Sequence, residues 1–307
     1  MSVPHAKVIV NPAAGGYSIR REWPGIRKQM QRIGLSFDYE YSEGVGHAID
    51  LAKIAVNDGY RYLVAVGGDG TINEVANGIL RSTASTETIL GIVSGGTECS
   101  FARSLGIPQN YSTACSLLTG HRRLLIDVGV VEYTSEGQYL QRFFVNEADV
   151  GFGAAVIEAT KDIPRYYIPT INHLHRVFRG IRSLYYYRNK HVTLHIENKS
   201  DSICTSVVVM ANGCYLGGGM YVAPQARFDD GLLDMVIVGD TGRFELLKIW
   251  PTLYKGKHIS HPKIRFQKVT SGSIRASERV LVEADGELIG ECPVSFKILP
   301  SALTVVV

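Results

Sequence analysis

Residues 64–75 read VAVGGDGTINEV, and the first half of the chain is organised around this stretch. The stretch begins inside residues 62–66, an apolar run with β-branched side chains that predicts a buried strand. Gly67, Gly68 and Gly70 then crowd one turn, and apolar residues at helical spacing follow them. This combination predicts an anion site, because glycine lets a ligand approach the unpaired amides at the positive end of a helix.

Asp69 lies in this turn, although a carboxylate repels an anionic ligand. The residue makes chemical sense if it binds Mg²⁺ or takes a proton from an attacking hydroxyl group. The alternative is a tight turn between strand and helix, in which Asp69 serves only as a helix cap. A short motif is a hypothesis, so both interpretations stay open from these residues alone.

Strand and helix patterns alternate over residues 1–124, which predicts an α/β domain with a parallel sheet. Strands are expected to end just before Asn11, Ser42, Gly67 and Gly96. Because ligands bind at the carboxyl ends of parallel strands, these four loops should gather at one edge of the sheet. The sequence contains neither the dinucleotide-binding fingerprint nor the P-loop motif.

From about residue 125 the pattern changes to short strands separated by Gly, Asp and Asn. Such a pattern predicts a β-sandwich or a barrel, and a last apolar strand is expected at residues 303–307. Residues 161–191 interrupt it with an apolar, aromatic face surrounded by Arg and Lys. This segment suits an anionic membrane surface, and the alternative is a helix packed on the β domain with a solvated basic rim.

The composition excludes several classes of protein. A net charge of +3 over 307 residues, without a dense Lys/Arg run, gives no support for nucleic-acid binding. Five cysteines without a C-x-x-C pair favour reduced thiols in a cytoplasmic protein. No apolar stretch approaches the roughly 20 residues of a membrane span, so any membrane contact is expected to be peripheral.

Five motifs follow one another along the chain. They are NPAAG at residues 11–15, GGDGTINE at 67–74, GT before FAR within 96–103, DGLLD at 230–234 and DGE at 285–287. In this order they resemble the diacylglycerol kinase catalytic family, which includes sphingosine kinases and bacterial lipid kinases. The resemblance covers nearly the whole chain.

The resemblance implies a nucleotide-binding α/β domain at residues 1–124 and a β-sandwich domain for the lipid at residues 125–299. Residues 300–307 are expected to return toward the first domain. It also implies ATP and Mg²⁺ as cofactors. The implied nucleotide-binding residues are Asn11, Pro12, Gly15, Ser42, Gly67, Gly68, Asp69, Gly70, Thr71, Asn73, Glu74, Thr97 and Asp285.

Two of these positions carry a qualification. Ser42 stands where the family usually has Thr, which keeps the hydroxyl group. Asn11 also suits an ordinary turn before Pro12, so a structural role is an equal alternative.

The same resemblance assigns the catalytic and metal-binding residues. Glu287 is the implied general base, which takes the proton of the acceptor hydroxyl, with Asp69 as the rival base. A plain hairpin turn is the alternative for Asp285 and its glycine. The implied Mg²⁺ ligands are the carboxylate of Asp230 and the main-chain carbonyls of Arg227 and Leu232. A carboxylate in a loop is otherwise only a turn residue, so these assignments depend on the resemblance.

The sequence departs from the family pattern at two positions that lie near the acceptor in the family. Cys99 and Ser100 stand where the family commonly has Asn and Asp near the substrate hydroxyl. Losing an amide and a carboxylate changes the polar contacts that discriminate between substrates. The motifs on the phosphate-donor side are intact, so the departure leaves the identity of the acceptor open.

The leading hypothesis is an ATP-dependent kinase for a lipid hydroxyl, with diacylglycerol or a related lipid as substrate. The alternatives are an NAD kinase, which shares the GGDG element, and a nucleotide- or lipid-binding regulator that has lost acceptor chemistry. The expected partners are the lipid substrate and a membrane surface, without nucleic acid. The oligomeric state stays open, with a homodimer as one option.

Overall fold

The structure is a computed structural model that describes residues 4–95, 99–135, 137–159, 183 and 186–307. The chain divides into two compact units. Unit 1 comprises Met1–Asp127 and Ser301–Val307, and unit 2 comprises Val128–Pro300. Thr97 and most of the predicted basic segment at residues 161–191 lie outside the described residues.

Unit 1 is built on a parallel sheet, as predicted. The order across the sheet is β2-β1-β3-β4-β14, and every neighbouring pair is parallel. Val10 pairs with Tyr41 and with Val66, and Gly67 pairs with Ser94, so β1 to β4 end at one level. The strands are β1 (Ala6–Val10), β2 (Phe37–Tyr41), β3 (Tyr62–Gly67), β4 (Ile89–Ser94) and the end of β14 (Glu287–Val306).

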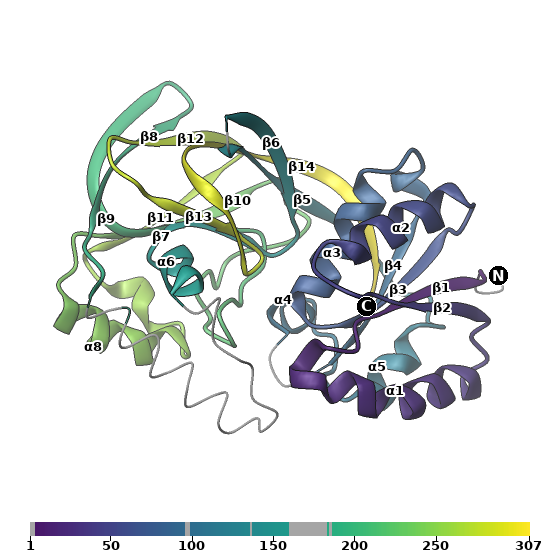
Figure 1. Cartoon of the computed structure of the whole chain (residues 1–307). Coiled ribbons are helices and arrows are strands. Elements are labelled where there is room, and N and C mark those ends of the chain that lie inside the picture. The colour runs from purple at the N-terminus through teal and green to yellow at the C-terminus, as the bar shows by residue number, and fades with distance from the viewer. Residues whose placement is uncertain (1–3, 96–98, 136, 160–182, 184–185) are drawn as a thin grey trace. The chain divides into compact units, whose positions relative to one another are not determined.

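Helices cover both faces of this sheet (Figure 1). Helices α1 (Ala14–Arg32) and α5 (Tyr111–Leu117) lie on one face, while α2 (His47–Asn57) and α3 (Asp69–Leu80) lie on the other. Two short elements, η1 (Ser85–Glu87) and α4 (Ser100–Ser104), flank β4 along the chain. Burial on both faces explains why β1, β3 and β4 are almost continuously apolar.

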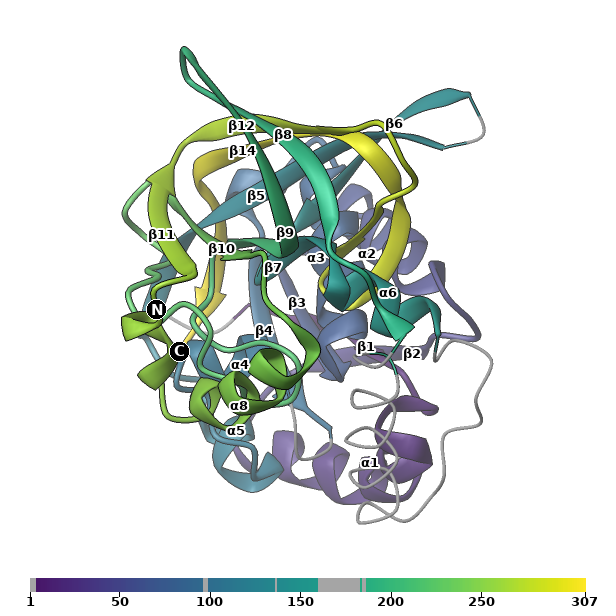
Figure 2. The same cartoon turned by 90° about the vertical axis from the view of Figure 1, so that its left-hand side faces the viewer.

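Unit 2 is rich in strands that are mostly antiparallel. Two long strands each pair with different neighbours along their length. Strand β9 pairs with β8 near its start and with β7 and β10 near its end. Likewise β14 pairs first with β13 and then with β12, and β12 pairs with β8 (Figures 1 and 2). The pairings therefore close around one apolar core. The strands are β5 (Arg123–Ser135, beginning in unit 1), β6 (Gln138–Phe144), β7 (Glu147–Gly151), β8 (Lys190–Ile196), β9 (Lys199–Ala211), β10 (Leu233–Gly239), β11 (Ile264–Val269), β12 (Ser271–Ala276), β13 (Leu281–Ala284) and most of β14.

Among the described residues, unit 2 also contains elements outside the predicted strands. These include the helices α6 (Phe152–Glu158) and α8 (Arg243–Leu253) and the 3-10 turn η2 (Lys257–Ser260). None of the helices in the described ranges is both long enough and apolar enough to cross a membrane.

Close contact between α2 and α3 depends on Gly78. A Cβ atom at this position would lie 2.4 Å from the carbonyl oxygen of Ile49 and 2.5 Å from the Cβ of Ala52, both on α2. We expect Gly78→Ala to lower the free energy of unfolding by about 1–3 kcal/mol, because the helices must separate. Gly44→Ala is the control, since no atom lies within 4 Å of a Cβ there. Denaturant unfolding measures both, and equal midpoints would contradict this account of the helix contact.

Candidate active site

The order of the strands in unit 1 places a topological switch point between β1 and β3. Strand β2 lies on one side of β1, whereas β3 and β4 lie on the other. In open α/β sheets, ligands bind outside the carboxyl ends of the strands at such a point. Here the switch-point loops are those of Asn11 and Gly68. The side-chain amide of Asn11 donates to Thr71 Oγ1 over 3.0 Å and ties the two loops together.

Glu74 caps helix α2. Its carboxylate accepts the N–H groups of Gly46 over 2.9 Å and Ala48 over 3.1 Å, and the side chain is buried. These amides belong to the start of α2, where a negative charge is favourable. The contacts give Glu74 a structural role, and its contact with a nucleotide stays a prediction.

Asp69 caps α4 and not its own helix. One carboxylate oxygen accepts the N–H of Ser100 over 2.9 Å, and the other accepts the N–H of Phe101 over 3.0 Å. The thiol of Cys99 donates to Asp69 as well, over 3.0 Å. Burial and the nearby charge of Asp69 raise the pKa of this thiol well above its ordinary value, so it stays protonated. Cys99 therefore supplies a hydrogen-bond donor to one of the two predicted bases.

The start of helix α3 differs, because its N-cap residue is Gly68, which has no side chain to cap the first turn. Among the described residues, no atom would lie within 4 Å of a Cβ at Gly68, and the backbone is extended there (φ −94°, ψ −171°). The fold therefore does not require glycine at this position. By contrast, a Cβ at Gly67 would lie 2.4 Å from Thr71 Oγ1, so that glycine is needed for packing.

The loop after β1 lies beside the end of β4. Residues 15–17 are left-handed, with φ between 62° and 68°, and a Cβ at Gly15 would lie 2.3 Å from Ser18 Oγ and 3.6 Å from the carbonyl oxygen of Gly95. The hydroxyl oxygens of Ser18 and Ser94 are buried, and within the described ranges they have no hydrogen-bond partner. Buried hydroxyl groups are normally satisfied, so these two fit a ligand that accepts hydrogen bonds.

The other predicted nucleotide-binding residues lie at the same edge or in α3. The amide of Ser42, just after β2, donates to the carbonyl of Val10 over 2.9 Å. Pro12 lies in the loop after β1, and Gly70 lies in the first turn of α3. Asn73 is fully buried inside α3. The edge thus collects the predicted residues of unit 1 that the structure describes.

In unit 2, Asp285 organises a neighbouring loop. Its carboxylate accepts the N–H groups of Val145, Asn146 and Glu147 over 2.7–2.9 Å. Asp285 is buried and has a positive φ of 49°, in the turn between β13 and β14. The predicted hairpin turn is therefore present, and its aspartate also fixes the connection between β6 and β7.

Glu287, the predicted base, begins β14 and forms an ion pair with Arg142. Their side chains are 2.6 Å apart, between Arg142 Nη2 and Glu287 Oε2. No sequence motif points to Arg142, because it lies in β6 outside all five motifs and 145 positions from its partner. A base at Glu287 has to leave this guanidinium, or keep one oxygen on it, when it accepts a proton.

Three buried acids lie next to the DGE turn. Ligand oxygens of Glu147, Asp149 and Glu283 all lie within 4.8 Å of one another. Burial and the two neighbouring charges raise the pKa of Glu283 well above its ordinary value, while burial raises that of Asp149 to about 6. Folding therefore favours the protonated form of Glu283. It also accepts the N–H of Gly286 over 2.7 Å, which links the acids to the turn.

The loop predicted to bind Mg²⁺ already contains a cation. Asp230 accepts the N–H of Leu232 over 3.1 Å, and its other oxygen lies 2.6 Å from Lys268 Nζ. Lys268 is also 3.4 Å from Asp234. Carboxylate and carbonyl oxygens, including the carbonyl of Arg227, are of the type that Mg²⁺ prefers. An ion at this loop would have to displace the ammonium group of Lys268.

Comparison with known proteins places this chain in a family. Residues 5–131 match the diacylglycerol kinase catalytic domain, and residues 147–307 match the YegS C-terminal NAD kinase beta sandwich-like domain. The chain belongs to the diacylglycerol kinase catalytic family. The motif-based recognition and the predicted fold class are thereby confirmed.

Similar proteins named diacylglycerol kinase are found in Bacillus and Staphylococcus. The chain is 28% identical to the diacylglycerol kinase of Bacillus subtilis over 295 residues, which are 95% of this chain and 92% of that protein. It is 26% identical to that of Staphylococcus carnosus over 293 residues, 95% and 91% of the two chains.

Solved structures share the fold. A diacylglycerol kinase from Bacillus anthracis has a TM-score of 0.73 at 22% identity and covers 98% of this chain and 96% of its own. Yeast NADH kinase complexed with NADH has a TM-score of 0.50 at 10% identity, covering 99% and 83%.

The buried acids make stability depend on pH in a defined direction. A carboxyl whose pKa is raised by folding holds its proton more tightly in the native state, so the free energy of unfolding falls as pH rises above the unfolded value of 4.5. We expect Glu283→Gln, which imitates the protonated acid, to remove up to about 1.4 kcal/mol per pH unit of this slope.

Glu132→Gln is the matched control for this experiment. Ion pairing and hydrogen bonds lower the pKa of Glu132 to about 2. Its contribution to the free energy of unfolding is therefore lost only as pH falls below 4.5. Thermal or urea unfolding measured from about pH 5 to pH 8 distinguishes the variants. Parallel stability curves for the wild type and Glu283→Gln would show that folding does not raise the pKa of Glu283.

Proposed function

We propose that this chain is a kinase that transfers the γ-phosphoryl group of ATP to the hydroxyl group of a lipid, diacylglycerol or a relative of it. The observation that carries the proposal is the start of α3 at the switch point of the sheet, where the N-cap is a glycine and no atom of the described residues would lie within 4 Å of a Cβ at Gly68. The family membership and the names of the relatives support the reaction class.

The donor site follows from the amides of α3. The first amides of a helix carry partial positive charge, and the open space at Gly68 leaves room for a phosphate group to reach them. The hydroxyl groups of Ser18 and Ser94 add donors. Asn11 and Thr71 hold the two loops around this position. ATP fits this arrangement of neutral donors, because the carboxylates of α3 are directed at the neighbouring helices.

Acceptor chemistry is assigned to Glu287, which takes the proton of the lipid hydroxyl during the attack, with Asp69 as the second candidate. Arg142 orients the carboxylate of Glu287 through the ion pair. Mg²⁺ on the phosphates supplies charge neutralisation when it is bound. The loop of Asp230 is a second proposed Mg²⁺ site, where the ion would compete with the ammonium group of Lys268 for the carboxylate.

A contact of Cys99 bears on the alternative of a regulator without catalysis. The family commonly has an Asn here, and the thiol still donates to Asp69 over 3.0 Å. The donor to this carboxylate is thus retained despite the substitution, which favours a working enzyme. Incubating the protein with labelled ATP and extracted lipids identifies the acceptor, and NADP formation from NAD would instead support the NAD kinase alternative.

Gly68→Ala tests the donor site without disturbing the fold. The new Cβ meets no protein atom, so stability should change by less than about 0.5 kcal/mol. ATP affinity should fall about tenfold or more, because the methyl group occupies the approach of the phosphate. Gly242→Ala, at an equally open helix start in unit 2, is the control. Calorimetric titration with ATP measures both, and wild-type affinity in Gly68→Ala would exclude this site.

Glu287→Gln tests the base. The amide keeps the size of the side chain and one acceptor for Arg142, but it cannot take a proton at neutral pH. Turnover should fall by about 10²–10⁴-fold, while ATP binding is retained. Asp69→Asn should impair both turnover and folding of the α4 region, because a cap is lost. A wild-type rate in Glu287→Gln would transfer the role of base to another residue.

A further inference from the structure

Helix α8 exposes an apolar face. Its inner side carries Ile249, which is buried in a cluster with Val222, Val236 and Ile264. The outer side should be polar if it faced only water. Instead Phe244 is 83% exposed, and further large apolar side chains are exposed nearby. These are Leu247, Tyr254, Ile259 and Phe266.

The same surface is basic. Residues 243–260 contain four cations (Arg243, Lys248, Lys255 and Lys257) and one acid (Glu245), a net charge of +3 with histidines neutral. The whole chain of 307 residues has the same net charge. Within the described ranges, no ion pair joins Lys248, Lys255 or Lys257 to an acid. Burial lowers the pKa of His258, so it adds no charge near neutral pH.

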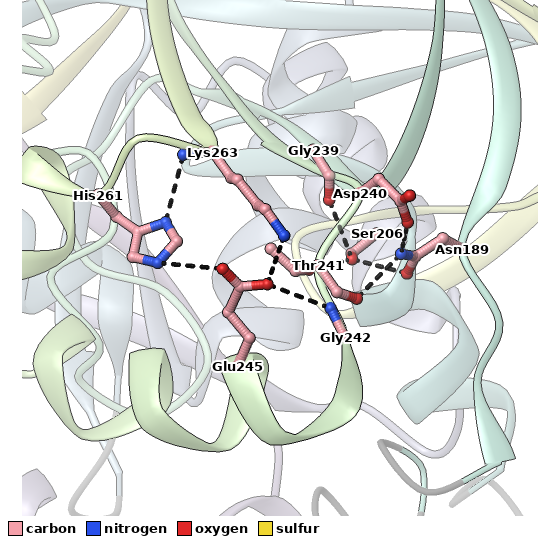
Figure 3. A network of polar contacts seen from close by, with 9 residues as sticks. All are labelled: Asn189, Ser206, Gly239, Asp240, Thr241, Gly242, Glu245, His261 and Lys263. Carbon is pink, nitrogen blue, oxygen red and sulfur yellow. Dashed lines mark hydrogen bonds and ion pairs between the residues drawn. The ribbon is translucent and has the colours of Figure 1, made fainter.

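Polar contacts fix the start of α8 against the strands (Figure 3). Glu245 accepts the N–H of Gly242 over 3.3 Å, and its carboxylate lies 2.6 Å from Lys263 Nζ and 3.6 Å from His261. The only acid of the surface in residues 243–260 is thus neutralised within the protein. Its charge does not oppose an anionic partner.

A second set of contacts in the same view holds the residues before α8. Asn189 donates to the carboxylate of Asp240 over 2.6 Å and to the carbonyl of Thr241 over 2.9 Å, and Ser206 bonds both Asn189 and Thr241 (Figure 3). Such contacts fix the backbone that leads into α8, and an ordered backbone reduces the entropy lost when a partner binds.

An open groove of about 660 Å³ runs between α8 and η2. Phe244 and Ile249 contribute apolar lining, and Lys248 and Lys257 contribute cations. Apolar and cationic side chains side by side match the two parts of an anionic phospholipid, its acyl chain and its phosphate. A protein partner with an acidic surface would explain the cations but not the exposed apolar side chains beside them, of which Phe244 is the most exposed.

We propose that the α8–η2 surface, residues 243–260, docks on a bilayer that contains anionic phospholipids. Phe244 and Leu247 enter the boundary between headgroups and acyl chains, while Lys248, Lys255 and Lys257 contact lipid phosphates. The proposal does not depend on phosphoryl transfer, although a kinase for lipids needs such a surface to reach its substrate. It also does not involve the residues proposed for nucleotide binding.

The test is vesicle co-sedimentation of the full chain without nucleotide. The protein should bind vesicles of phosphatidylcholine mixed with phosphatidylglycerol, much more weakly vesicles of phosphatidylcholine alone, and less as salt is raised. Phe244→Ser and Lys248→Glu should each weaken binding about tenfold. Both side chains are exposed, so the variants should unfold at the wild-type temperature.

Matched control variants come from α2, where Lys53 and Ile54 are likewise exposed. Lys53→Glu and Ile54→Ser should bind the vesicles like the wild type. Wild-type binding by Phe244→Ser and Lys248→Glu would overturn the proposal, as would the absence of binding to the anionic vesicles. Phosphorylation of a short-chain, water-soluble diacylglycerol, measured in parallel, should be unchanged in the α8 variants. If the wild-type protein does not phosphorylate this soluble lipid, the result counts against the proposed reaction and not against the docking surface.

Discussion

Two carboxylates of α3 determine how the starts of the neighbouring helices are satisfied. Amides in the first turn of a helix need acceptors, and Glu74 supplies them for α2 while Asp69 supplies them for α4. The charges of both acids are thereby compensated by positive helix ends. This explains why an aspartate and a glutamate flank a glycine turn that suits an anion. The start of α3 itself has a glycine as its N-cap residue, and it lies at the switch point of the sheet.

The second unit uses acids differently. Asp285 accepts three amides and so fixes a loop, whereas Glu287 lies beside Arg142. Burial and the acidic neighbours of Glu283, which lies two residues before Asp285, raise its pKa and so favour its protonated form. The DGE sequence is thus held from several sides. Rigid support of this kind is what a carboxylate needs if it is to act at a defined position.

The sequence patterns predicted the fold of unit 1 well because its strands β1, β3 and β4 are buried on both faces. Residues 62–66 form an apolar run for that reason, and the glycines after them mark its end. Helix α8 escaped prediction, since Pro251 interrupts it and Phe244 on its outer face is apolar, which blurs the periodicity. The partners of Asp69, Glu74 and Glu287 also escaped, because they lie between about 26 and 145 positions away and no local pattern encodes them.

The central claim is that the amides at the start of α3 bind the phosphates of a nucleotide. Amide chemical shifts of glycine-labelled protein during titration with ATP and Mg²⁺ test it most directly. The account expects the signals of Gly68 and Gly70 to shift most, with those of Gly242 and Gly256 in unit 2 unchanged. Saturable ATP binding that leaves Gly68 and Gly70 unshifted would contradict it.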